Sequence, residues 1–175
     1  MLKKIRTDSD YSGDGASKNG LVPVSNINCD SFELGLLPII RHFLMSLTGQ
    51  RPDAWFLAYA IAAERLGERM GFPVAHGLAG ITERSIELLD THPPFKDPLC
   101  ADNRSVATEY EAAFLEMMHH MRRDQTQQAR AKAAIVMQNR EDPGFIRACL
   151  AFARRHRVGD PAQPAEVPPG LKIIS

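Results

Sequence analysis

The sequence predicts an all-α fold, a compact bundle of about six helices over residues 30–157, with irregular arms at residues 1–29 and 158–175. Three observations support this. Apolar residues recur every three to four positions through the central region, which is the period of a helix with one buried face. Helix-start and helix-stop residues lie between these segments, and no two segments alternate as paired strands would. The arms lack this period, and the C-terminal arm is extended and rich in proline.

The first helix is predicted to begin after Asp30. Glu33 stands three residues later, and this pair has the spacing of a capping box. Pro38 falls inside the segment and predicts either a kink or a break into two shorter helices, because proline has no backbone N–H to donate. Gly49 is a natural end for the helix.

The second helix is predicted to begin near Pro52 and to end at Gly71. Its centre, residues 54–63, is apolar on every side, so we expect this helix to lie buried between its neighbours. The third helix is predicted to begin between Pro73 and His76 and to end before the two prolines at 93–94.

A loop of 13 residues follows, over 92–104, and loops of this length are often functional or cover another element. The fourth helix is predicted to run from Asp102 or Ser105 to Arg123. One helix or two could occupy residues 105–138, since no glycine or proline interrupts them. We favour two, because the apolar period fails after the fourth helix.

Two further start signals place the last helices. Asp124 and Gln127 have the spacing of a second capping box and are expected to open the fifth helix. Asp142 followed by Pro143 combines an N-cap residue with a proline at the first helical position, so the sixth helix is predicted to begin there. Gly159 lies just past its expected end.

Composition places the chain among globular proteins. Of its 175 residues 44% are hydrophobic and 24% are charged, which excludes a disordered or fibrous chain. Its three cysteines are far apart and odd in number, so we expect reduced thiols and a cytoplasmic location. No apolar stretch follows the basic residues near the start, and the longest apolar runs, 34–40 and 54–63, are too short to cross a bilayer.

Histidine and glutamate side chains form the first candidate site. Glu116 and His119 stand three residues apart on one side of the predicted fourth helix, which is half of the ligand pattern of di-iron bundle proteins. No second Glu-x-x-His pair occurs, and a solvated face explains the pair equally well. His120 lies closer to the apolar side of the helix. His42 shares a side of the first helix with small residues and could line a pocket or pack locally. No cofactor is expected.

Charge is distributed unevenly although Lys plus Arg and Asp plus Glu both number 21. Residues 29–121 hold 7 basic and 13 acidic side chains, a net charge of −6, whereas residues 122–157 hold 9 basic and 3 acidic ones, a net charge of +6. The basic residues of the second stretch are Arg122, Arg123, Arg130, Lys132, Arg140, Arg147, Arg154, Arg155 and Arg157. They could bind nucleic acid or phosphate, or they could complement the acidic helices within the molecule.

Three functional hypotheses follow. The first is a non-enzymatic helical interaction or regulatory module that binds a protein partner, including a second copy of itself. It rests on the apolar second helix, on three methionines in the fourth and on the lack of a catalytic motif. The second is a nucleic-acid- or phosphate-binding regulator that uses residues 122–157. The third is a bundle with a metal or small-ligand pocket near His42, His119 and His120. No membrane partner is expected.

Overall fold

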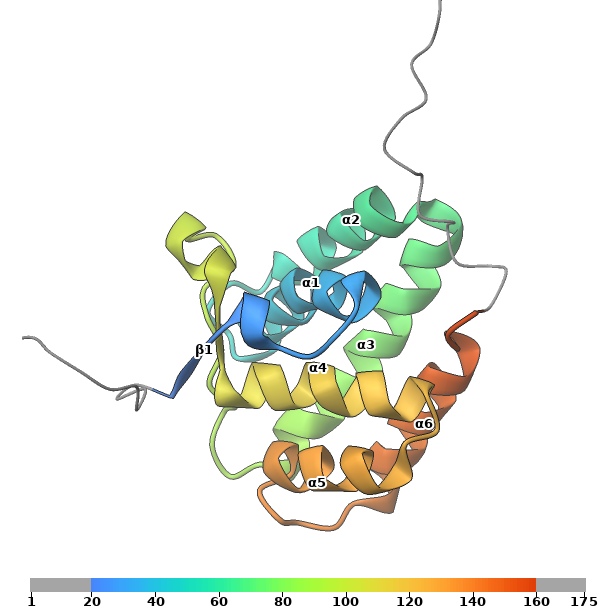
Figure 1. Cartoon of the computed structure of the whole chain (residues 1–175). Coiled ribbons are helices and arrows are strands. Elements are labelled where there is room, and N and C mark those ends of the chain that lie inside the picture. The colour runs from blue at the N-terminus through green and yellow to red at the C-terminus, as the bar shows by residue number, and fades with distance from the viewer. Residues whose placement is uncertain (1–19, 160–175) are drawn as a thin grey trace, which may run out of the picture.

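The computed structural model describes residues 20–159, and within them the prediction of an all-α bundle is confirmed (Figure 1). Six α-helices make up most of this part of the chain, together with two short 3₁₀ helices and one small two-stranded sheet. The portions of the predicted arms at 1–19 and 160–175 lie outside the described residues. None of the described helices is both long and apolar enough to span a membrane.

Two helices, α1 (Ser31–Leu47) and α4 (Glu109–Arg122), form the centre of the bundle. In Figure 1 α4 crosses the middle of the molecule with α1 above it and α5 below it. Buried residues make up 11 of the 17 positions of α1 and 10 of the 14 positions of α4. The predicted capping box of α1 is confirmed, and α1 continues unbroken through Pro38, so the alternative of two shorter helices is wrong.

The predicted boundary between the second and third helices is wrong. Helix α2 (Ala54–Leu66) ends at Gly67, and α3 (Glu68–Leu88) begins directly after it and includes Pro73. Gly67 has φ +73°, a left-handed conformation that glycine adopts without strain, so the chain turns here. Gly71, the predicted stop, lies inside α3, where a side chain would meet the backbone of α2. Its lack of a side chain therefore permits a close helix contact.

The expectation that α2 is buried on all sides is also wrong. Helix α2 packs on α1 and α3 through Ala54, Ala58 and Ala62, which are its only buried residues. These alanines repeat every four positions, so they lie on one side of the helix. The large side chains of Trp55 and Phe56 lie on the surface. Small residues thus form the helix contact, and the bulky apolar ones are left outside it.

The chain between α3 and α4 contains more structure than the predicted loop. A 3₁₀ helix, η2 (Ala101–Ser105), leads into strand β2 (Val106–Thr108), which pairs antiparallel with β1 (Leu21–Pro23). A further short 3₁₀ helix, η1 (Val24–Asn26), follows β1. The predicted starts of the fourth helix at Asp102 or Ser105 are therefore too early. Helix α4 begins at Glu109, where Thr108 and Glu111 form a capping box.

A buried ion pair holds this segment against the centre of the bundle. Arg41 of α1 donates from Nε and Nη2 to the carboxylate of Glu111, at 2.7 and 3.0 Å. Arg41 also donates to the backbone carbonyls of Asn103 and Val106, while Glu111 accepts from the backbone N–H of Lys96. The buried Arg41–Glu111 pair therefore holds two parts of the connection between α3 and α4, one at Lys96 and one at residues 103–106.

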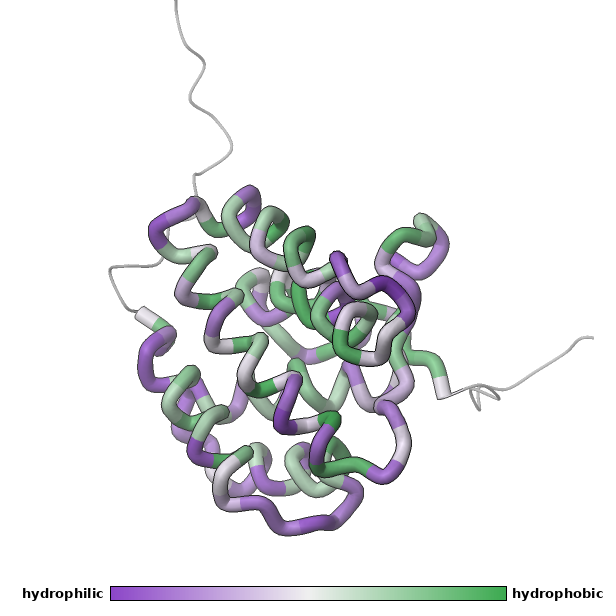
Figure 2. Tube along the Cα trace, turned by 180° about the vertical axis from the view of Figure 1, so that it is seen from behind, coloured by the Kyte–Doolittle hydropathy of each residue, from purple (hydrophilic) through white to green (hydrophobic). Residues whose placement is uncertain are grey.

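The last three helices follow the predicted order. Helix α4 and α5 (Thr126–Val136) are separate, which confirms the two-helix interpretation. The expected cap at Asp124 is wrong, because Asp124 has φ +57° and forms part of the turn. Helix α6 (Pro143–Arg155) begins as predicted, with Asp142 accepting hydrogen bonds from two backbone N–H groups. The connection between α5 and α6, at the bottom of Figure 2, is hydrophilic after the buried Met137.

Candidate functional site

A cluster of charged side chains joins the start of α1 to the end of α4. Asp30 and Glu33, which cap α1, face His119 and Arg122 of α4 and the C-cap residue Arg123. Arg122 donates to Glu33, and both of these side chains are fully buried. Arg123 Nη2 lies 2.5 Å from Asp30 Oδ2, and His119 Nδ1 lies 3.4 Å from Glu33 Oε2. Acids at a helix start and bases at a helix end also complement the two helix dipoles.

The surroundings of Asp30 favour its charged form. Burial acts to raise the pKa of Asp30, but hydrogen bonds from Glu33 and Arg123 outweigh it and hold that pKa well below its usual range. The Arg122 guanidinium lies 4.0 Å from the centre of the Phe32 ring. Within the described residues its Nη2 atom has no hydrogen-bond partner.

A metal ion is one chemical possibility at this cluster. Asp30, Glu33 and His119 each offer a ligand atom, and these atoms lie within 4.8 Å of one another. However, Arg122 and Arg123 already neutralise both carboxylates. A cation would have to lie beside two guanidinium groups, which repel it. The geometry therefore suits an ion-pair network that fastens α1 to α4.

The histidine and glutamate residues proposed from the sequence do not converge on one point. Glu116 Oε2 lies 2.6 Å from Lys132 Nζ of α5, and His120 Nδ1 lies 2.7 Å from Gln125 Oε1. His119 faces Glu33 instead of joining Glu116 in a site. His42 lines a separate cavity on the other side of α1. Asp30 and Glu33 were noticed only as helix caps, because no local pattern pairs them with residues about ninety positions away.

Much of the basic stretch at 122–157 is paired within the molecule. Acidic side chains lie within ion-pair distance of five of its nine basic residues, namely Arg122, Arg123, Lys132, Arg140 and Arg157. The other four, Arg130, Arg147, Arg154 and Arg155, are exposed and form no ion pair with any described residue. Four of these five pair with acidic residues that precede residue 122, so part of the charge split is complemented within the molecule. The nucleic-acid hypothesis keeps the four unpaired arginines.

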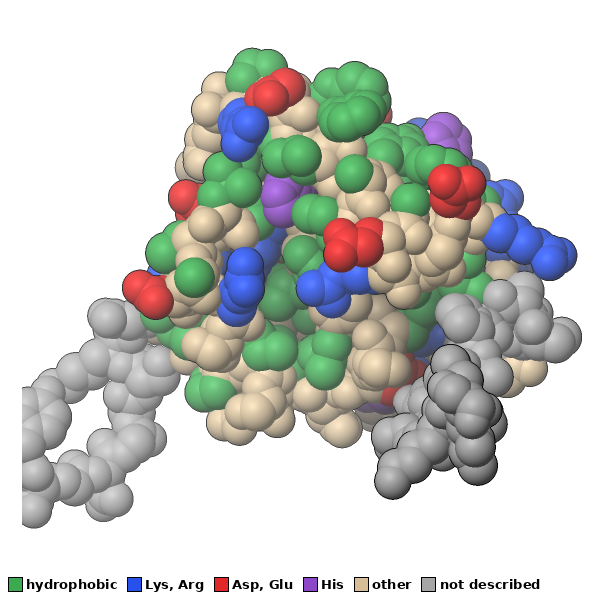
Figure 3. Space-filling model, turned by 90° about the horizontal axis from the view of Figure 1, so that it is seen from above, with side chains coloured by type: hydrophobic (Ala, Val, Ile, Leu, Met, Phe, Trp, Pro, Cys, Tyr) green, Lys and Arg blue, Asp and Glu red, His purple; other side chains and the backbone are tan. Residues whose placement is uncertain are grey.

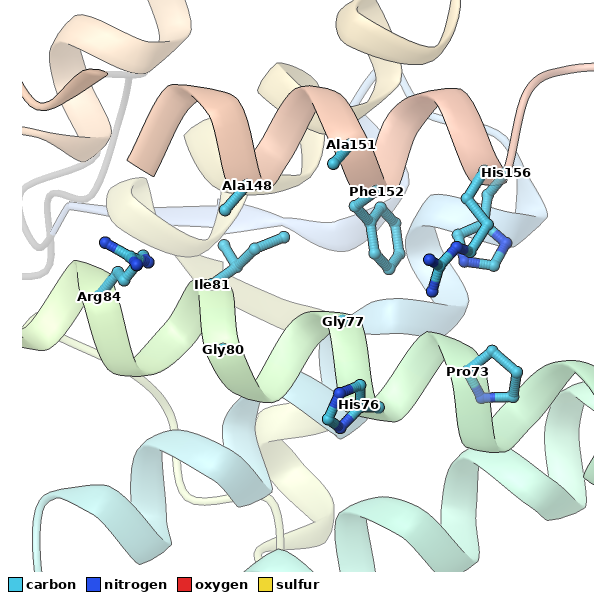
Figure 4. Close-up of a pocket in the computed structure, with 11 residues that line it drawn as sticks. Pro73, His76, Gly77, Gly80, Ile81, Arg84, Ala148, Ala151, Phe152 and His156 are labelled. Atoms are coloured by element: carbon cyan, nitrogen blue, oxygen red, sulfur yellow. The ribbon is translucent and has the colours of Figure 1, made fainter. Parts of the chain in front are cut away.

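A shallow cavity of about 250 Å³ lies between α3 and α6 (Figure 4). Phe152 projects from α6 toward α3 beside Gly77, where a Cβ atom would come within 2.7 Å of the ring. His76, Arg84 and Arg155 line the rim. Phe152 occupies the space that the missing side chain of Gly77 leaves. This part of the cavity is therefore filled by the contact between α3 and α6.

Three aromatic side chains of α2 and one of the adjoining α3 form a cluster that we call the aromatic face: Trp55, Phe56 and Tyr59 of α2, and Phe72 of α3. The ring centre of Trp55 lies 6.0 Å from that of Phe56 and 6.2 Å from that of Tyr59. The ring centres of Tyr59 and Phe72 are 6.4 Å apart. Tyr59 also contacts the buried Phe43 ring edge-on, which anchors the cluster to the core. Trp55, Phe56 and Phe72 remain 52%, 63% and 47% exposed. Large rings gathered on a surface are typical of protein interfaces.

Comparison with protein-family models, with curated proteins and with solved structures finds no match to this chain. Its function is therefore inferred from its own surfaces and cavities.

Proposed function

We propose that this chain is a helical protein-interaction module that associates with a second copy of itself through the aromatic face. The observation that carries the proposal is the exposure of Trp55, Phe56 and Phe72 on one continuous ring cluster. Trp and Tyr dominate binding energy in interfaces, because they bury much apolar area and lose little conformational entropy. A helix that is apolar on every side normally has every side covered.

Charge favours a second copy as the occupant. No charged residue occurs between Ala54 and Ala63, so the face offers nothing to a strongly charged partner. The flanking charges alternate in sign, with Arg51 paired to Asp53 at one end of α2 and further acidic and basic residues at the other. The whole chain has no net charge at pH 7, so two copies do not repel each other.

The area of the face sets the expected strength. An aromatic side chain buries roughly 150–250 Å² when covered, so three half-exposed rings offer roughly 300 Å². A stable dimer covers about 800 Å² on each partner, so neighbouring residues of α2 such as Leu57 and Ala60 must also contribute. We therefore expect a weak dimer whose population depends on concentration. The three cysteines are free, which supports the cytoplasmic location that we also propose.

Sedimentation velocity over a range of about 1 μM to 1 mM tests the proposal. Trp55 is the only tryptophan, so its fluorescence reports on this face alone, and its emission is expected to shift to the blue as the dimer forms. Phe56→Glu keeps that reporter. It adds a negative charge in the first turn of α2, which the helix dipole tolerates, and it is expected to abolish dimerisation.

The matched control is Leu99→Glu, because Leu99 is 53% exposed and lies on the connection between α3 and α4. This variant is expected to dimerise like the unaltered protein. A strictly monomeric protein up to about 1 mM, or a Phe56→Glu variant that dimerises as well as the control, contradicts the proposal.

A further inference from the structure

A second cavity in the described part of the chain lies away from the aromatic face. It has a volume of about 410 Å³ and is bordered by α1, by the last turns of α2, by η1 and by Pro98 and Arg104. Pockets for small molecules typically measure about 300–1,000 Å³, so one small molecule fits here and a folded segment does not. Figure 3 looks onto this side of the molecule and shows basic side chains on either side of a hollow that contains a histidine.

The lining of this cavity combines an apolar surface with positive charge. Its apolar part consists of Val24, Leu34, Leu37, Pro38, Ile61 and Pro98. Arg65 of α2 and Arg104 of η2 border the same cavity and are exposed. Neither arginine forms an ion pair or a hydrogen bond with any described residue, although acidic residues occur nearby in the sequence. Two unengaged guanidinium groups beside an apolar wall are suited to an anion that has an apolar body.

His42 adds a polar ring to the lining of this cavity. Its side chain is nine-tenths buried, and Nδ1 lies 2.7 Å from the Pro38 carbonyl oxygen, to which it donates. This bond leaves Nε2 without a partner in the described part of the chain, and His42 lines the cavity. Nε2 accepts a hydrogen bond from a hydroxyl group or, when protonated, donates one to a carboxylate. A polar atom placed in this way in an apolar wall orients a ligand.

Arg41 contributes to the floor of the cavity but not to its free charge, because Glu111 and two backbone carbonyls engage its guanidinium. Glu64 is the one acidic residue that lines the cavity, and it opposes an anion. With Arg65 and Arg104 counted against Glu64, the exposed rim carries a net positive charge. The charge balance therefore favours a small monoanion over a cation or a neutral molecule.

We propose that this cavity binds a small organic carboxylate with an apolar body, whose carboxylate lies between Arg65 and Arg104 and whose apolar part lies on α1. Inorganic phosphate has the charge but would leave the apolar wall in contact with water, so it binds less tightly. The cavity and the aromatic face lie on different sides of α2, so this site functions independently of self-association.

Isothermal titration calorimetry of the full chain with octanoate tests this proposal. We expect saturable binding of one octanoate per chain, with octan-1-ol and inorganic phosphate each binding at least about tenfold more weakly, because one lacks the charge and the other lacks the apolar body. Equal affinities for octanoate and octan-1-ol, or for octanoate and phosphate, overturn the assignment. Failure of octanoate to bind also overturns it.

Substitutions on the rim locate the binding. Arg65→Ala and Arg104→Ala are each expected to weaken octanoate binding about tenfold, because a hydrogen bond between charged groups is lost, whereas Glu64→Gln is expected to tighten it. All three side chains are exposed, so these variants are expected to fold. Arg154→Ala, an exposed arginine of α6 without an ion pair, is the matched control and should bind normally. If Phe56→Glu rather than the rim variants removes binding, octanoate lies on the aromatic face and the proposal is wrong.

Discussion

Replacing Gly71 by alanine is expected to force α2 and α3 apart. A Cβ atom at this position would lie 2.3 Å from the backbone oxygen of Ala62, whereas ordinary contacts of this kind begin at 3.4 Å. The obstructing atom belongs to a helix backbone and cannot rotate away, so the two helices must separate by about 1 Å at their crossing. As the helices separate, the packing of the α2 alanines against α3 would also loosen.

The size of the effect can be isolated with a second glycine of the same helix. Gly80 is exposed, and a Cβ atom there meets nothing within 4 Å. Gly80→Ala is therefore expected to stabilise the protein by up to about 1 kcal/mol through helix propensity alone. Gly71→Ala gains the same propensity but adds an overpacking cost of about 2–3 kcal/mol. The propensity gain cancels in the comparison, so the two variants should differ by about 2–3 kcal/mol.

Urea unfolding followed by far-UV circular dichroism measures this difference. We expect a lower midpoint for Gly71→Ala at an unchanged slope, because the surface exposed on unfolding stays the same. In thermal unfolding the two variants should differ by roughly 4–12 °C, at about 2–4 °C per kcal/mol for a chain of this size. If Gly71→Ala is as stable as Gly80→Ala, the close approach of α2 and α3 does not exist.

Two further predictions concern buried groups. Glu111→Gln leaves the buried Arg41 guanidinium without a counterion, so we expect the free energy of unfolding to fall by about 3 kcal/mol or more. Urea unfolding measures this loss. A loss below about 1 kcal/mol would contradict the role of the pair. Cys100 is exposed, whereas burial raises the pKa of Cys149, and burial with nearby carboxylates raises the pKa of Cys29 to about 12. One thiol should therefore react rapidly with Ellman's reagent in the native protein, and Cys100→Ser should remove that reaction. A second rapidly reacting thiol would show that Cys29 or Cys149 does not stay buried.

Local chemistry explains which helix boundaries were predictable. Asp30 with Glu33, and Asp142 with Pro143, act within three or four residues, and both helices begin where these signals stand. Gly71 has the residue type of a helix stop, but its place in the fold is set by Ala62 of the neighbouring helix. A glycine that ends a helix and one that permits a close contact look alike in sequence, so the boundary at Gly67 was missed.

The candidate sites show the same division. The sequence identified His42 as a residue that could line a pocket, because small residues share its side of the helix. It gave no sign of Arg65 and Arg104, which approach His42 only when α2 and η2 fold against α1. The aromatic side chains of α2 were recognised as apolar but were expected to be covered.

By itself the sequence determined the helical class, the number of helices and the signals that start α1 and α6, because hydrophobic period and capping depend on neighbours along the chain. Only the tertiary structure decided which side of α2 is covered. Alanines permit closer packing than aromatic rings, so the contact formed through Ala58 and Ala62 and left Trp55 and Phe56 outside. It also decided which basic residues of 122–157 pair with acidic residues earlier in the chain, since partners such as Glu33 and Arg122 meet across 89 residues.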